Sequence, residues 1–118
     1  MLSKSARLNV SENFKWVVGG SRMETPSLKL FYRMGSNPQA KSLKGSTGLA
    51  KVGVAVNSKE FKKANLRVDV KRLCFEAARM IYDNLPAGLN LVIMPKSSVT
   101  EKSVEELVLE LQDAKIIN

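Results

Sequence analysis

The feature that most constrains the fold is the segment at residues 90–94, with the sequence NLVIM, in which an apolar run follows Asn90 without a break. A strand with one solvent-exposed face alternates apolar and polar residues, whereas an unbroken apolar run is expected for a strand that is covered on both faces. Pro95 closes the run, because proline cannot donate to a sheet ladder. We therefore expect residues 90–94 to form a strand inside a layered fold.

Two further segments alternate in polarity and predict strands, at residues 27–34 and 51–56. In the second of these, valines share one face, while Gly53 and Ala55 leave the other face shallow. Residues 35–50 are rich in Gly, Ser and Pro and have no period, which predicts a flexible hairpin loop between the two strands.

Three segments predict helices. Residues 11–18 are a short helix that begins after a Ser N-cap and ends at two glycines, and a capping box at Ser103 and Glu106 starts the last helix. The longest pattern covers residues 59–83, with apolar residues at spacings of three and four that predict a core stripe: Leu66, Val70, Leu73, Ala77 and Ile81. The resulting order, α-β-β-α-β-α, predicts a small α+β sandwich, with residues 1–118 forming a single domain.

Composition excludes most catalytic chemistry. The 118 residues include no His and one Cys, Cys74, so imidazole-dependent nucleophile systems, structural zinc sites and disulfides are excluded. Residues 45–51 resemble a phosphate-binding loop only superficially, because they lack its Gly-Lys pair and precede a strand. We expect no catalytic residue, no metal site, no cofactor bound by the protein alone and no small-molecule substrate.

The charge distribution points to a polyanionic partner. The net charge is +8, and the first 83 residues hold sixteen basic and six acidic side chains, whereas residues 84–118 hold three and five. This asymmetry favours nucleic acid, with a merely solvated surface as the alternative. A membrane surface is less favoured, since no basic helix has a broad apolar face. No signal-peptide core or membrane span is visible, so we expect a cytoplasmic location.

One face of the long helix is a candidate phosphate-binding surface. Arg67, Lys71, Phe75 and Arg79 follow one another at spacing four, with Arg72 beside them, and the acidic residues of the helix fall on a different side. Stacked cations can contact successive phosphates, although a solvated helix face would look similar. The candidate RNA-binding residues are Lys59, Lys63, Arg67, Lys71, Arg72 and Arg79.

Four aromatic residues near the N-terminus are candidates for stacking on unpaired bases: Phe14, Trp16, Phe31 and Tyr32. Each could instead be a core residue, because short strands and helices need apolar anchors. The pattern alone leaves both interpretations open.

Five segments, in order, make the chain resemble the bacterial ribonuclease P protein component. Val68, Asp69 and Phe75 depart from the Arg-rich signature of that family. The similar segments are Arg7-Leu8 with residues 12–17, residues 51–56, residues 67–73 with Glu76 and Arg79, residues 91–96, and the helix start at Ser103 and Glu106.

The resemblance implies a left-handed βαβ crossover and an accessory subunit of a ribonucleoprotein. The partner RNA would remove the 5′ leader of precursor tRNA with Mg²⁺ in the RNA complex, and the protein alone would have no activity. Phe14 and Tyr32 would line a cleft for the single-stranded leader, between the Arg-rich helix and the sheet face. The alternative is a stand-alone basic RNA-binding or ribosome-associated protein without a catalytic role. A metal-independent nuclease is a weaker interpretation, because no acid–base pair is visible.

Overall fold

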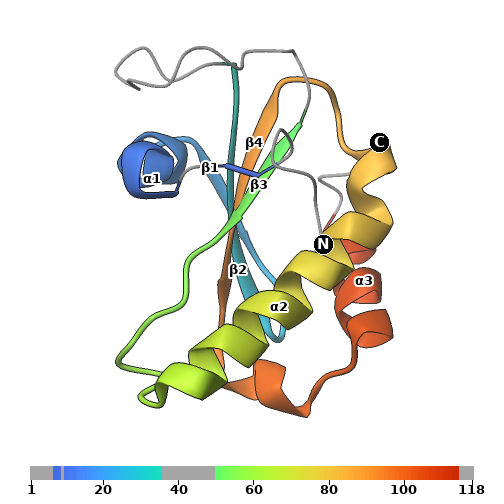
Figure 1. Cartoon of the computed structure of the whole chain (residues 1–118). Coiled ribbons are helices and arrows are strands. Elements are labelled where there is room, and N and C mark those ends of the chain that lie inside the picture. Colours follow the sequence, from blue (N-terminus) through green and yellow to red (C-terminus); the bar gives the residue numbers. More distant parts are fainter. Residues whose placement is uncertain (1–6, 9, 36–49, 115–118) are drawn as a thin grey trace.

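A four-stranded sheet with helices on both faces forms the centre of the structure (Figure 1). The structure is a computed structural model that describes residues 7–8, 10–35 and 50–114. The sheet has the order β1-β2-β4-β3 and consists of β1 (Ser21–Glu24), β2 (Leu28–Met34), β3 (Lys51–Val54) and β4 (Leu89–Pro95). One face is covered by α1 (Val10–Val18) and the other by α2 (Ala64–Ile81) and α3 (Val104–Asp113), with short 3-10 turns η2 (Tyr82–Asn84) and η3 (Ser97–Glu101).

Strand β4 is the central element, and the prediction that it is covered on both faces is confirmed. It pairs antiparallel with β2 and parallel with β3. Leu91 and Ile93 are fully buried in the main core against α2 and α3, whereas Val92 is fully buried in a smaller cluster with Leu8 and Val17 under α1. The continuous apolar run therefore serves two separate cores.

The connection from β3 through α2 to β4 joins parallel, adjacent strands. Figure 1 shows that α2 runs back along one face of the sheet and that the crossover is left-handed. This is the unusual hand for a βαβ unit, and it is the hand that the resemblance implies.

The predicted element order is present, with one additional strand, β1. Its four residues are mostly exposed and have no apolar alternation, so nothing in the sequence distinguishes them from a loop. The strand exists because it pairs with β2, from Ser21 opposite Tyr32 to Glu24 opposite Lys29.

Two local predictions are wrong. Residues 35–50 do not join a hairpin, because β4 lies between β2 and β3; of this segment the structure describes only Gly35 and Ala50. The long helix begins at Ala64 rather than at residue 59. The side chain of Phe61 is buried, which ties the preceding segment to the main core in a non-helical conformation.

Helix α1 sits very close to the sheet because Gly53 lacks a side chain. A Cβ atom at Gly53 would clash with Cγ2 of Val10 and would lie 3.3 Å from the carbonyl oxygen of Leu8. The first turn of α1 thus packs on the shallow face that the sequence predicts at Gly53. The chain just after α1 also lies close to the sheet, since a Cβ at Gly20 would lie 2.8 Å from the carbonyl oxygen of Tyr32.

We predict that Gly53→Ala lowers the free energy of unfolding by about 1–3 kcal/mol, the usual cost of overpacking. Denaturant unfolding followed by circular dichroism measures the change. Gly19→Ala is the matched control, because its Cβ would meet its nearest neighbours at 3.5 Å, an ordinary contact. Equal stability of the two variants would contradict this account of how α1 is seated.

Candidate nucleic-acid interface

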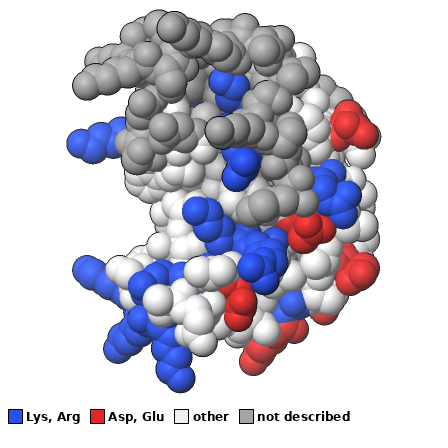
Figure 2. Space-filling view, in the orientation of Figure 1, with Lys and Arg blue, Asp and Glu red and all other residues white. Residues whose placement is uncertain are grey.

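The sheet face on the α1 side is only partly covered. Helix α1 covers Val92, while Lys29 is exposed and Met94 is half-buried. A pocket opens here, lined by Arg22, Met23, Glu24, Lys29, Phe31 and Met94. Figure 2 shows the molecule hollowed on its left side, between the level of α1 and the start of α2. We call this surface the groove and define its floor by Arg22, Lys29, Phe31 and Met94.

Two phenylalanine rings lie where α1 meets the groove floor. Phe14 of α1 and Phe31 of β2 are both half-buried, and both pack against the small cluster under α1. Each ring is therefore anchored in the core while part of it remains accessible. Accessible aromatic rings are the groups on which unpaired bases stack.

Tyr32 lies on the opposite face of the sheet from Phe14. Side chains alternate along β2, so Tyr32 follows Leu28 and Leu30 into the main core, whereas Phe31 faces α1. The predicted arrangement of Phe14 and Tyr32 in one cleft is wrong. The alternation of residues 27–34 was the signal that could have selected Phe31.

Cations border the groove at the start of α2. Lys59, Lys62 and Lys63 are exposed in the segment that precedes the helix. Figure 2 shows Lys and Arg gathered at the lower left, where α2 begins, whereas Asp and Glu lie mainly on the right, on the side of α3. On this face, the charge asymmetry of the sequence therefore corresponds to a concentration of cations near the start of α2.

The basic residues of α2 have different roles in the structure. Lys71 and Arg72 are exposed and have no ion pair within the described part of the chain. Arg67 is half-buried, and its Nη1 donates to the carbonyl oxygens of Phe61 at 2.8 Å and of Lys62 at 3.1 Å. Arg67 therefore stabilises the start of the helix.

The predicted row on α2, exposed and separate from the acidic residues, is wrong at two positions. Arg79 donates to Glu76, with Nη2 at 3.0 Å from Oε2, so part of its charge is neutralised. Phe75 is buried in the main core rather than exposed within the basic row. The reason is that the second half of α2 packs against the sheet and α3, which buries a wider arc of the helix than the stripe predicted from spacing.

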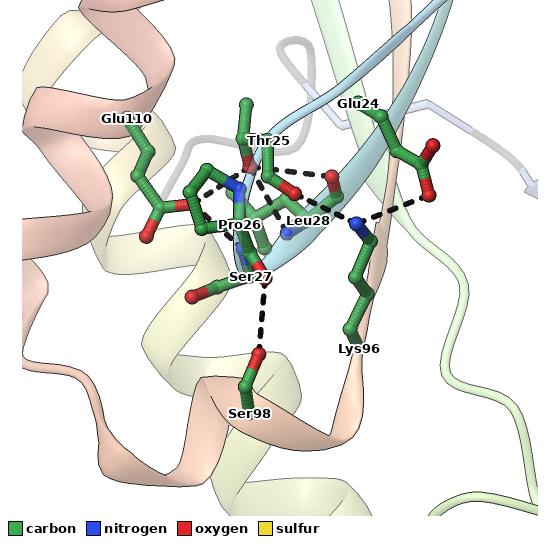
Figure 3. A network of polar contacts seen from close by, with 8 residues as sticks. All are labelled: Glu24, Thr25, Pro26, Ser27, Leu28, Lys96, Ser98 and Glu110. Carbon is green, nitrogen blue, oxygen red and sulfur yellow. Dashed lines mark hydrogen bonds and ion pairs between the residues drawn. The ribbon is translucent and has the colours of Figure 1, made fainter.

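A polar network fixes the turn between β1 and β2 at the far end of the groove (Figure 3). Glu110 of α3 accepts from Oγ1 of Thr25 at 2.7 Å and from the backbone N–H of Ser27 at 2.9 Å. Nζ of Lys96 donates to the Thr25 carbonyl at 2.8 Å and pairs with Glu24 at 3.0 Å. This contact with Lys96 lowers the pKa of Glu24. The carboxylate is thus already paired, and the groove floor keeps an excess of positive charge.

The described residues offer binding groups rather than reactive ones. Burial raises the pKa of the Cys74 thiol to about 12, so it is not a nucleophile at neutral pH. Within the described ranges, no three His, Cys, Asp or Glu side chains are placed to hold a metal ion, and no helix is long and apolar enough to cross a membrane. Accessible aromatic rings beside cations suit single-stranded nucleic acid, because rings stack on bases and cations contact phosphates.

Comparison with known proteins gives one consistent family. A family model described as Ribonuclease P matches residues 2–115. The fold is similar to that of the RNase P protein from Thermotoga maritima, with 20% identity, a TM-score of 0.73, and coverage of 95% of this chain and 97% of that chain. For the RNase P protein from Staphylococcus aureus the identity is 15% and the TM-score 0.72, with coverage of 98% and 100%. No curated protein matches the chain.

We predict that the cations of α2 separate into two classes. Lys71→Ala combined with Arg72→Ala should lower the magnitude of the salt slope of RNA binding by about two, because two fewer counterions are released, and should leave stability nearly unchanged. Arg67→Ala should instead cost about 1 kcal/mol or more of unfolding free energy, since two carbonyls lose their donor. The measurements are binding isotherms at several salt concentrations and denaturant unfolding.

Lys102→Ala is the matched control for this test, because Lys102 pairs with Glu106 at 3.8 Å, at the start of α3. It should change neither the salt slope nor the stability by much. An unchanged slope in the double variant would show that another surface contacts the phosphates.

Proposed function

The chain belongs to the ribonuclease P protein family, and we propose that it is the protein subunit of a ribonucleoprotein that matures the 5′ ends of tRNAs in the cytoplasm. Its partners would be the ribonuclease P RNA and precursor tRNA. The RNA would carry out the hydrolysis with Mg²⁺ bound in the RNA complex, and this chain would hold RNA in place.

The observation that carries the proposal is the groove beside α1. Phe14 and Phe31 lie on the same side of the sheet, and Arg22 and Lys29 line the same floor as Phe31. A single strand laid along this floor would stack a base on one or both rings, and each such contact typically contributes about 1–3 kcal/mol. Its phosphates would lie beside the two cations. The 5′ leader is the single-stranded part of the proposed substrate.

A second set of cations would hold the folded RNA. Lys71 and Arg72 are exposed on α2, and Lys59 and Lys63 are exposed just before it. Figure 2 shows Lys and Arg gathered where α2 begins. Exposed cations on and next to an ordered helix suit the phosphates of a structured RNA, because the helix backbone needs no ordering on binding.

The alternative, a stand-alone basic RNA-binding or ribosome-associated protein, would use the same cations. It would not need the paired rings beside a basic floor. A protein of that kind should bind precursor and mature tRNA equally, so a preference for RNA with a leader distinguishes the two functions.

The direct test is reconstitution with the ribonuclease P RNA of the source organism. We expect the protein to accelerate cleavage of precursor tRNA at the mature 5′ end in limiting Mg²⁺. We expect the protein without RNA to cleave nothing, because its sequence has no His and shows no acid–base pair to activate water. A lack of stimulation would refute the assignment as a subunit. Cleavage by purified, RNA-free protein would refute the assignment of catalysis to RNA.

We predict that Phe14→Ala and Phe31→Leu each weaken binding of precursor tRNA by about 1–3 kcal/mol, the value of a lost stacking contact, and leave the affinity for mature tRNA unchanged. Tyr32→Ala is the control from the other face of the sheet. It should lower the free energy of unfolding by up to about 3–5 kcal/mol, as for a core aromatic residue, without a leader-specific effect. Leader-specific loss in Tyr32→Ala alone would place the leader on the opposite face.

A further inference from the structure

We propose that Arg33 is a positioning residue that holds α1 from the side away from the groove and thereby fixes Phe14 above the groove floor. The inference rests on the proposed function of the groove. It assigns to Arg33 an internal role rather than a direct contact with RNA.

The contacts of Arg33 connect the end of β2 to the last turn of α1. The guanidinium carbon lies 4.8 Å from the centroid of the Trp16 ring, within the range of a cation–π interaction. Its Nη1 also donates to the backbone carbonyl oxygen of Trp16 at 3.0 Å. The side chain therefore holds both the ring and the backbone of the same residue.

Among the residues that the structure describes, no backbone N–H beyond the helix donates to the carbonyl that Arg33 contacts. Beyond α1, the N–H of Gly19 donates to Lys15 and the N–H of Gly20 donates to Val17. The Trp16 carbonyl lies between these two acceptors, and Arg33 supplies its donor. A positive charge at this position also interacts favourably with the helix dipole.

The geometry of α1 places Arg33 and Phe14 on opposite flanks of the helix. At about 100° per residue, Trp16 leaves the helix roughly 200° from Phe14, and the fully buried Val17 points to the sheet between them. On the sheet, Phe31 and Arg33 face the same side, two positions apart in β2. On one flank of α1, Trp16 contacts Arg33. On the other flank, Phe14 packs against the same small cluster as Phe31. A rotation of α1 that releases Trp16 from Arg33 would therefore move Phe14 relative to Phe31.

The backbone brings α1 close to Arg33, which leaves little room for a different arrangement. A Cβ at Gly20 would lie 2.9 Å from Cβ of Arg33, and one at Gly19 would lie 3.7 Å from its Nη1. Gly20 therefore allows the close approach of α1 to Arg33, whereas a Cβ at Gly19 would make only an ordinary contact.

The test uses Trp16 as its own probe, because it is the only tryptophan in the chain. Arg33→Met removes the charge and the donor, and Arg33→Lys keeps the charge without the planar guanidinium. Lys15→Met is the matched control, since Lys15 is an exposed cation on the same helix. For each variant we would measure the emission and anisotropy of Trp16 in the free protein, thermal unfolding, and the affinities for precursor and mature tRNA.

We expect Arg33→Met to shift the Trp16 emission and lower its anisotropy in the folded protein. It should weaken precursor binding by roughly two- to fivefold, the equivalent of an exposed cation–π contact, with mature tRNA unaffected. Arg33→Lys should fall between this variant and the wild type in both measurements. Lys15→Met should keep the wild-type emission, and any loss of affinity should be equal for the two RNAs.

Unchanged emission and anisotropy in folded Arg33→Met would overturn the proposal, and so would an emission change with a fully retained preference for the leader. If Arg33→Met does not fold, Arg33→Lys decides by the same two measurements. A wild-type protein that shows no leader preference would refute the proposed function of the groove, while the emission measurements would still report whether Arg33 holds α1.

Discussion

The burial of β4 on both faces is the constraint on which the rest of the structure depends. Leu91 and Ile93 require the cover of α2 and α3, whereas Val92 requires cover on the other face. That second cover is a single helix of nine residues, which leaves Lys29 exposed and Met94 half-buried on the same face. The uncovered remainder is the groove. A central strand that must be buried, together with a helix that covers only part of one face, thus produces a binding surface without a dedicated domain.

Much of the fold could be predicted from segments whose local sequence pattern is compatible with only one type of secondary structure. The apolar run of β4 and the capping box of Ser103 and Glu106 agree with the structure, including both hydrogen bonds of the box. The predictions failed where contacts with residues distant in sequence determine the local structure. Strand β1 exists through its pairing with β2, and the start of α2 is set by the burial of Phe61. Of the candidate site, the exposed cations could be found from sequence, but the choice between neighbouring aromatic rings required knowing which face α1 covers.

Positive charge in this chain serves two purposes, and only the structure separates them. Lys96 ties the β1–β2 turn to the end of β4, Arg67 holds the start of α2, and Arg33 contacts α1. These cations are committed to positioning elements around the groove. Lys71 and Arg72, with the lysines before α2, remain exposed for phosphates. A count of charges therefore overstates the number of RNA contacts, and substitutions of the two groups should differ in kind: one group affects stability and geometry, and the other affects salt-dependent affinity.

The central claim is that single-stranded RNA lies on the α1 side of the sheet. It is tested most directly by photo-crosslinking in the reconstituted complex, with a 4-thiouridine placed at successive positions of the leader and the adducts mapped by mass spectrometry. The account predicts crosslinks to the groove, at Phe14, Lys29, Phe31 or Met94. Crosslinks confined to the opposite side of the sheet, at α3 or the outer face of α2, would contradict it.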